Sequence, residues 1–327
     1  MSSRLSCKWV MVLAVLCLAA VSIAPIEAKA QFPAKGKSIQ LIVPYAAGGS
    51  SDAGARMLAA GMEKVLGVPV MIVNKPGANG QLGWTLLSQS KPDGYTIGAT
   101  NFPGVITSYL DKDRKAVYNR NSFQPLALHV FDPSLFAVAA SSPYKTLNDL
   151  VAAAKERPGK ITIVSGILND AQFGIMQFEK MAGIKLAQVT FDQGTAPAVS
   201  ALLGGKIEVF CGNAGDVLAQ FKSGDVRILG IMDQKPSPFY PGVKTFEQQG
   251  YKLYNGSARG FSAPAGVPKD VIKVLNNAMK AAAATDDHKQ KMEGMALSIQ
   301  YKGSSDYTKF WLDYEKMVQE LMPLVKQ

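Results

Sequence analysis

One short segment of the chain combines the residue types that can bind a small anion through the backbone. The segment Val43–Asp52 reads VPYAAGGSSD and lies between an apolar run and a stretch with helical periodicity. Gly48 and Gly49 allow positive φ and a close approach of the backbone. The N–H groups of such a turn, together with the dipole of the following helix, form a site for an anion. A plain tight turn is the alternative interpretation, because a Gly-Gly pair is a weak motif.

The polar residues that end this segment are typical of a helix start. Ser50, Ser51 and Asp52 are all suitable N-caps. A carboxylate at the mouth of an anion site would repel the ligand unless capping engages it. The segment lacks the Gly-x-Gly-x-x-Gly spacing of a dinucleotide site and the Lys-Ser/Thr pair of a P-loop, so we do not expect a nucleotide here.

Further polar loops follow other predicted strands. A second glycine-rich loop covers residues 74–80 (NKPGANG), in which Lys75 is either an electrostatic contact or a surface charge. In open α/β sheets, ligands bind beyond the carboxyl ends of the strands, so several such loops could converge on one cleft. Taken singly, each is an ordinary loop. The other loops are Thr100-Asn101, Ser165-Gly166 and Asp192-Gln193-Gly194-Thr195.

Strands and helices that would position these loops alternate along the chain. This alternation predicts an α/β fold with mainly parallel sheets. The predicted strands are 39–43, 70–73, 95–99, 161–164, 186–190, 207–210 and 226–231. The predicted helices are 52–66, 79–90, one that opens at Thr146, 170–181, 198–203, one near 217–222, 269–285 and 306–324.

Two regions have the composition of crossings between lobes. One lies near residues 124–138 and contains Asp132-Pro133 between two apolar runs, and the other spans residues 235–263, rich in Pro and Gly. If both are crossings, residues 131–245 form one lobe, and residues 31–130 combine with 246–327 to form the other. This arrangement is the two-lobed clamshell of a solute receptor, whose cleft closes by hinge motion.

The N-terminal residues have the pattern of a secretory signal. Arg4 and Lys8 precede 16 largely apolar residues, and Ala28-Lys29-Ala30 provides a cleavage site. A membrane anchor is the alternative, but a helix needs about 20 apolar residues to span a bilayer. We expect cleavage after Ala30 and a periplasmic protein. Cys211 is then the sole cysteine, and we expect it to be buried.

The charge and the reactive residues exclude several functions. The net charge of +10 becomes +8 when residues 1–30, with three basic residues and one acidic residue, are removed. The lysines are dispersed, which argues against nucleic acid as a partner. His129 and His288 lie far apart in sequence, and neither a catalytic triad nor a metal-ligand spacing is present. We therefore expect no enzyme, no metal and no cofactor.

Five motifs in order along the chain carry a resemblance to a known family. They are PYAAGGSSD at 44–52 with Arg56, NKPGANG at 74–80 with Gly83, PDGYT at 92–96, ALLGGKIE at 201–208 and APAGVP at 263–268. With these motifs the chain resembles the substrate-binding receptors of tripartite tricarboxylate transporters, also called Bug receptors. The resemblance covers essentially the whole mature chain.

This resemblance implies a periplasmic type II clamshell that binds a small organic carboxylate and delivers it to an integral-membrane permease. A monomer is expected, and a ligand sensor for a signalling partner is the alternative role. In the family the first loop holds one carboxylate through backbone amides and ordered water, and the second lobe adds polar groups after its strands. The candidate ligand-binding residues are Tyr45, Ala47, Gly48, Gly49, Ser50, Asp52, Asn101, Ser165, Gly166, Asn169, Gln193, Gly194, Thr195, Asn213 and Arg259.

The sequence departs from the family pattern where the distal end of the ligand should bind. Leu168 and Gln172 replace a Gly and a His that are frequent in the family, and the stretch 190–194 (TFDQG) is one residue longer than usual. A frequent Trp is absent from residues 257–260. These changes leave the identity of the carboxylate open. Arg259 either pairs with a distal carboxylate or forms a structural ion pair near the hinge.

Overall fold

The computed structural model describes residues 32–191 and 195–325. The predicted signal, its cleavage site, Gln193 and Gly194 lie outside the described residues. The chain separates into two units, residues 1–34 and residues 35–327, and the helices and strands of the described residues all lie in the second unit.

A mixed sheet forms the first lobe. Its strand order is β10-β4-β9-β3-β1-β2, in which β1 pairs in parallel with β2 and β3, and the pairs β3–β9, β9–β4 and β4–β10 are antiparallel. The strands are β1 (Ile39–Val43), β2 (Val70–Asn74), β3 (Thr96–Phe102), β4 (Phe123–Ala139), β9 (Gly256–Pro264) and β10 (Ile299–Lys302). The helices are α2 (Ser50–Leu66), α3 (Gln81–Ser88), α4 (Gly104–Leu110), α9 (Lys269–Ala284), α10 (Asp286–Gly294) and α11 (Ser304–Val325).

The second lobe is built on the far end of β4. There β4 pairs with β7 and β8, while β5 and β6 form a parallel pair that a single bridge joins to the residue before β7. The strands are β5 (Thr162–Ser165), β6 (Ala187–Thr190), β7 (Phe210–Asn213) and β8 (Val226–Ile231). The helices are α5 (Leu147–Glu156), α6 (Asp170–Ala182), α7 (Thr195–Leu203) and α8 (Leu218–Ser223), and the 3₁₀ turn η4 (Ala214–Val217) follows β7.

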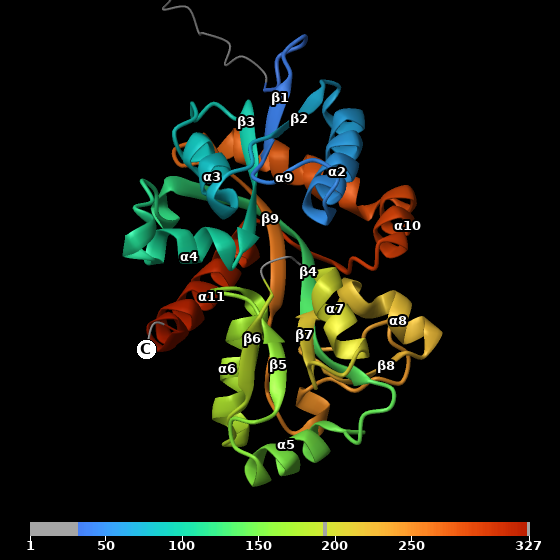
Figure 1. Ribbon diagram of the computed structural model, residues 1–327. Coiled ribbons are helices and arrows are strands. Elements are labelled where there is room, and N and C mark those ends of the chain that lie inside the picture. Colours follow the sequence, from blue (N-terminus) through green and yellow to red (C-terminus); the bar gives the residue numbers. More distant parts are fainter. Residues whose placement is uncertain (1–31, 192–194, 326–327) are drawn as a thin grey trace, which may run out of the picture. The chain divides into compact units, whose positions relative to one another are not determined.

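The two lobes are joined where β4 and β9 run side by side (Figure 1). The pairing with β9 ends at Pro133 opposite Gly256, and the pairing with β7 begins at the next residue, Ser134. A side chain at Gly256 would place its Cβ 2.7 Å from the Cα of Pro133, closer than real contacts allow. Glycine is therefore required at this position, because the two backbones approach closely.

Each lobe has its own apolar core. In the first lobe, aromatic side chains from β3, β4 and α11 pack together, with Phe102 centred 4.8 Å from Trp311 and 5.4 Å from Tyr314. In the second lobe, Phe136 of β4 packs edge-to-face against Phe178 and Phe246. Because β4 contributes side chains to both cores, the position of this strand constrains the packing of both lobes.

The α/β two-lobed fold predicted from the sequence is confirmed. The two regions expected to be crossings contain β4 and β9, which pair with each other. Strand β4 is one continuous strand of 17 residues and not two short runs. Strand β7 begins three residues later than predicted. The predicted 269–285 helix ends at Ala284, because the Thr285 hydroxyl accepts a hydrogen bond from the His288 N–H and opens α10. The residue limits of the lobes stay a prediction.

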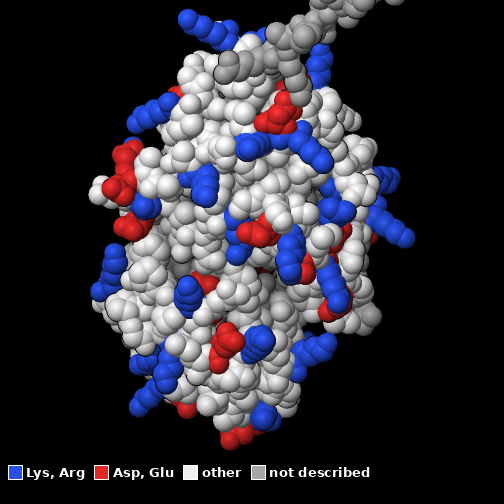
Figure 2. All heavy atoms as spheres, turned by 180° about the vertical axis from the view of Figure 1, so that it is seen from behind, with Lys and Arg blue, Asp and Glu red and all other residues white. Residues whose placement is uncertain are grey.

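Cys211 is free and buried, as expected. On the face shown in Figure 2, basic side chains are scattered among acidic ones. Within residues 32–191 and 195–325, no helix is both long enough and apolar enough to cross a membrane.

A buried histidine pair joins β4 to α10. The Nε2 atoms of His129 and His288 lie 2.7 Å apart, and both residues are at most 3% exposed. Burial, with a smaller effect from His288, lowers the pKa of His129 to about 3, and burial also lowers the pKa of His288. Both rings are therefore neutral in the folded protein at neutral pH.

This pair predicts a pH dependence of stability. A histidine whose folded pKa lies below its unfolded pKa of about 6.5 makes its full contribution to the free energy of unfolding above that pH. This contribution is lost as the pH falls toward the folded pKa. From pH 7 to pH 5, the loss is about 2 kcal/mol for one such histidine. We expect urea unfolding of His129→Gln to show a free energy that falls less between these pH values than in the unchanged protein. Parallel pH curves for the two proteins would contradict this role.

Candidate functional site

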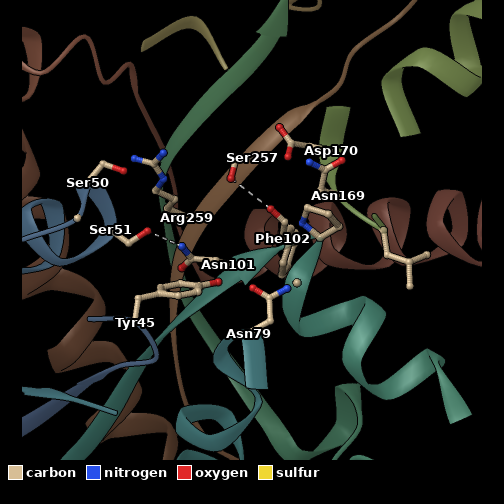
Figure 3. A pocket seen from close by; sticks show the side chains of 14 residues that line it. Tyr45, Ser50, Ser51, Asn79, Asn101, Phe102, Asn169, Asp170, Ser257 and Arg259 are labelled. Carbon is tan, nitrogen blue, oxygen red and sulfur yellow. Dashed lines mark hydrogen bonds between the residues drawn. The ribbon is translucent and has the colours of Figure 1, made fainter. Parts of the chain in front are cut away.

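A cavity of about 300 Å³ lies between loops of the first lobe and the start of α6 in the second. Figure 3 shows the side chains of Tyr45, Asn79, Asn101 and Arg259 on one side of it and Asn169 on the other. Its polar side chains come partly from segments that follow strands and partly from helix starts and from the strands β3 and β9 themselves. The lining residues are Tyr45, Gly49, Ser50, Ser51, Asn79, Asn101, Phe102, Pro103, Gly104, Leu168, Asn169, Asp170, Ser257 and Arg259.

The glycine-rich loop is held by Asp52. Its Oδ2 atom accepts hydrogen bonds from the Gly48 N–H and from Nε of Arg56, both at 2.9 Å. Its Oδ1 atom accepts from Nδ2 of Asn74 at 2.9 Å, and the same Nδ2 donates to the Tyr45 carbonyl at 3.0 Å. Asp52 therefore ties the first glycine-rich loop to the second.

The charge of Asp52 is part of this arrangement. Burial alone would raise its pKa, but the hydrogen bonds from Arg56, Gly48 and Asn74 outweigh burial and hold the pKa at about 2. The carboxylate is only 2% exposed and does not line the cavity. The cap position of α2 belongs to Gly49, without a side-chain hydrogen bond. The Asp52 side chain thus organises the loop behind the cavity wall.

The absence of a side-chain cap leaves the start of α2 open toward the cavity. Ser50 and Ser51, the first residues of this 17-residue helix, both line the cavity. The N–H groups of a first helical turn have no partner within the helix and carry the positive end of its dipole. Ser51 is fixed in place, because its Oγ accepts a hydrogen bond from Nδ2 of Asn101 at 2.8 Å.

Strand pairing places Arg259 at the same cavity. Arg259 lies opposite Asn101 in the β3–β9 register and next to Val130 of β4. Its Nη2 donates to Oδ2 of Asp132 at 3.1 Å, and the two side chains are 14% and 4% exposed. Its Nη1 is buried and has no hydrogen-bond partner among the described residues. Arg259 therefore lines the cavity and also forms the ion pair that was the alternative interpretation.

A second cavity of about 190 Å³ adjoins the first and shares Asn169 and Asp170 with it. Asn169 caps α6, because its side chain accepts from the Gln172 N–H at 2.9 Å. Ser165 donates to the side chain of Gln188 at 3.1 Å. The lining residues are Val164, Ser165, Gly166, Asn169, Asp170, Ala171, Phe191, Thr195, Ala198, Phe210, Cys211, Gly212, Asn213 and Asp216.

The structure brings most of the predicted site residues to one of these two cavities. Those at the first cavity are Tyr45, Gly49, Ser50, Asn101, Asn169 and Arg259; those at the second are Ser165, Gly166, Thr195, Asn213 and again Asn169. Ala47, Gly48 and Asp52 line neither cavity, and Gln193 and Gly194 lie outside the described residues. The Gly48 N–H in particular is engaged within the loop by Asp52.

Several lining residues were not among the predictions. Asp170 is the main one, because it borders both cavities and accepts hydrogen bonds from Ser134 and Asn213. Asn79 had a signal in the sequence, since it lies in the second glycine-rich loop. Phe102, Pro103 and Gly104 follow the polar pair Thr100-Asn101 and carry no polar side chain that would have marked them.

Comparisons with known proteins agree on one family. The family model described as tripartite tricarboxylate transporter family receptor matches residues 54–325. A relative from Cupriavidus necator, named UPF0065 protein in gbd 5′ region, is 30% identical over 319 residues, which cover 94% of each chain.

Solved structures show the same fold. A TctC solute binding protein from Polaromonas, solved without ligand, has a TM-score of 0.80 and 26% identity over 89% of this chain and 100% of its own. MatC from Rhodopseudomonas palustris with bound malate has a TM-score of 0.68 and 23% identity, covering 89% and 99%. R. palustris Rpa4515 with adipate has a TM-score of 0.72 and 21% identity, covering 90% and 99%.

The hydrogen bonds of Asp52 predict the effect of removing its charge. In Asp52→Asn the bond from Arg56 loses its charge assistance, and one oxygen acceptor becomes a donor. Hydrogen bonds to a charged group contribute roughly 1.5–3 kcal/mol, so we expect the free energy of unfolding to fall by about that amount. Urea denaturation of the purified variant at pH 7 measures this change.

A matched control is Asp313→Asn, which removes an exposed helical ion pair with Lys309. Exposed pairs contribute at most about 1 kcal/mol. If Asp52→Asn were no less stable than Asp313→Asn, Asp52 would not be the anchor of the loop.

Proposed function

Because this chain belongs to the tripartite tricarboxylate transporter family of receptors, we propose that it captures a small carboxylate between its two lobes and delivers it to a tripartite-type membrane permease. The family consists of solute-binding proteins, so a role in binding, not catalysis, is the starting point. The N-terminal signal pattern of residues 1–30 supports export to the periplasm, where such a receptor meets its ligand.

The observation that carries this proposal is the position of Arg259. A guanidinium with one donor unpartnered among the described residues borders a cavity that the uncapped start of α2 also lines. A buried donor without a partner costs about 1–3 kcal/mol. A carboxylate entering the cavity offers an acceptor to this guanidinium and to the first-turn N–H groups, so both features favour an anion.

The ligands of the solved relatives are consistent with two such contacts. Malate and adipate, bound by the two R. palustris proteins, each carry a carboxylate at both ends. In this chain we assign one carboxylate to the Gly49–Ser51 backbone and the other to Arg259. Of the departures from the family pattern, Leu168 lines the second-lobe side of the cavity, and Gln172 accepts a hydrogen bond from the Leu168 N–H. We expect these two positions to govern which carboxylate fits.

We expect at least one small carboxylate to raise the melting temperature of the mature protein. A thermal-shift panel of acetate, benzoate, malate, adipate, citrate, aspartate and glucose tests this, because a ligand that binds only the folded state stabilises it. In Arg259→Gln the affinity for the best carboxylate should fall at least about tenfold, a free-energy change of ~1.4 kcal/mol.

A control variant separates loss of this contact from loss of an arginine in general. Arg120→Gln removes a guanidinium that pairs with Glu315 and lines neither cavity, so its affinity should stay unchanged. Stabilisation by glucose alone, with no response to any of the acids, would refute the anion site.

A further inference from the structure

The wall of the proposed ligand site holds more acid than base. Three carboxylates, Asp132 on β4, Asp170 at the start of α6 and Asp216 in η4, lie around the single guanidinium of Arg259. Asp132 and Asp170 are at most 9% exposed. If all three acids were ionised, this buried group would carry a net charge of −2, which is costly in a low-dielectric interior.

Asn213 links the carboxylates of Asp170 and Asp216 through hydrogen bonds, and the carboxylate of Asp132 interacts with both through charge. Nδ2 of Asn213 donates to Oδ2 of Asp170 at 2.7 Å and to the Asp132 carbonyl at 3.0 Å, and its backbone N–H donates to Oδ2 of Asp216 at 2.8 Å. The Ser134 hydroxyl donates to Oδ2 of Asp170 at 3.2 Å. A change of charge on one acid is therefore felt by the others.

This network borders both cavities. Arg259 and Asp170 line the first cavity, and Asp170 and Asp216 line the second. An anion that reaches Arg259 thus enters beside carboxylates that already share the one guanidinium. The approaching negative charge has to be balanced within the network or the binding free energy falls.

The neighbouring titratable groups do not supply that balance. The phenol of Tyr240 donates to the Ala214 carbonyl, that of Tyr314 to the Gly256 carbonyl, and the Cys211 thiol to the Ala171 carbonyl. Burial raises the pKa of all three, and burial lowers the pKa of His129, whose charge would be repelled by Arg259. Among the described residues around the network, Arg259 is thus the charge-balancing cation.

We propose that the anionic ligand binds together with a proton. The carboxylate of the ligand replaces that of Asp132 as the partner of Arg259, and the Asp132–Asp170–Asp216 network takes up one proton from the solvent. This inference rests on the proposed carboxylate function. No bond to the ligand forms or breaks in this step. The only transfer is that of a proton from water or buffer to a network carboxylate.

The environment of the three acids supports this linkage. Burial raises the pKa of Asp132 to about 7 although Arg259 opposes the shift, and burial raises that of Asp216 to about 6. Burial also raises the pKa of Asp170. Because the groups interact, these pKa values belong to the network as a whole. The network is therefore poised to gain a proton near neutral pH.

The sign of the pH dependence follows. A ligand that withdraws Arg259 from Asp132 and adds negative charge raises the network pKa further, so the complex holds more protons than the free protein. Affinity then increases as the pH falls from 8 to 6, by up to about tenfold per pH unit for one proton. A ligand whose carboxyl groups all have pKa values of roughly 4 remains fully ionised above pH 6 and contributes nothing to this pH dependence. For such a ligand the change in affinity between pH 8 and pH 6 belongs to the protein.

Isothermal titration calorimetry tests the proposal on the mature protein. The probe is whichever acid of the panel, beginning with adipate and malate, raises the melting temperature most. Titrations at pH 7 in phosphate and in Tris, whose ionisation enthalpies differ, give the number of protons taken up. We expect a net uptake of up to one proton, reduced at pH 7 by the share that the free network already holds, and a Kd at pH 6 well below that at pH 8. No uptake, with equal Kd at both pH values, would overturn the inference.

Variants assign the proton to the network. In Asp170→Asn and in Asp216→Asn we expect the uptake to fall and the pH dependence to flatten, and the second variant serves if the first does not fold. The control is Asp233→Asn, because Asp233 is also a buried acid with a raised pKa but contacts Gln300 outside both ligand cavities. Unchanged uptake in both network variants, or its loss in the control, would contradict the assignment.

The experiment distinguishes this inference from the proposed function. If no acid binds at any pH, the carboxylate function itself fails. If an acid binds with the same affinity from pH 6 to pH 8 and without proton uptake, the function stands and the proton linkage fails.

Discussion

The close contact between β4 and β9 is the constraint on which the rest of the molecule depends. At Pro133 and Gly256 the two backbones approach so closely that no side chain fits at Gly256. The contact lies where β4 leaves its pairing with β9 and begins its pairing with β7. Asp132 and Arg259, on the same two strands, are consequently held within hydrogen-bond distance at the junction of the lobes. The ligand cavity is built against this pair, so its chemistry is set by the same crossing that sets the fold.

The crossing is reinforced by buried polar contacts. Nδ2 of Asn255 donates to the Asp170 carbonyl and to the Ser134 hydroxyl, and the Tyr314 hydroxyl donates to the Gly256 carbonyl. These bonds join α6 of the second lobe and α11 of the first to the same few residues. A ligand that changes the partner of Arg259 acts at the point where these elements meet, which gives a physical route from binding to the relative position of the lobes.

The sequence was sufficient for many of the elements, but it did not predict β9, β10, α4 or α10. It was also insufficient for the network that joins the elements. Hydrophobic periodicity placed β8 correctly and α6 and α9 within one residue, because these segments bury a regular face against one core. The pair Asp132-Pro133 indicated a break, yet Pro133 lies inside β4, where the change of partner from β9 to β7 tolerates a missing N–H. The importance of Asp170 could not be predicted, since it depends on Asn213, 43 residues away, whose position is fixed only by strand pairing. The proximity of Asn101 to Arg259 depends likewise on the β3–β9 register.

The loop before α6 shows how a departure from the family pattern can be absorbed and still change the site. Leu168 has a φ of 53°, in the left-handed region that glycine adopts most readily. The backbone therefore keeps the conformation that suits the Gly frequent at this position in the family. A local contact stabilises this conformation of the Leu168 backbone, because Oε1 of Gln172 accepts a hydrogen bond from the Leu168 N–H at 2.8 Å. The two substitutions therefore work together: Gln172 fastens the loop and Leu168 adds a buried apolar side chain to the cavity wall. An apolar surface here does not solvate a charge. In the proposed function the carboxylates of the ligand therefore bind at the start of α2 and at Arg259. The contact that this proposal assigns to Leu168 is with the apolar chain between those carboxylates.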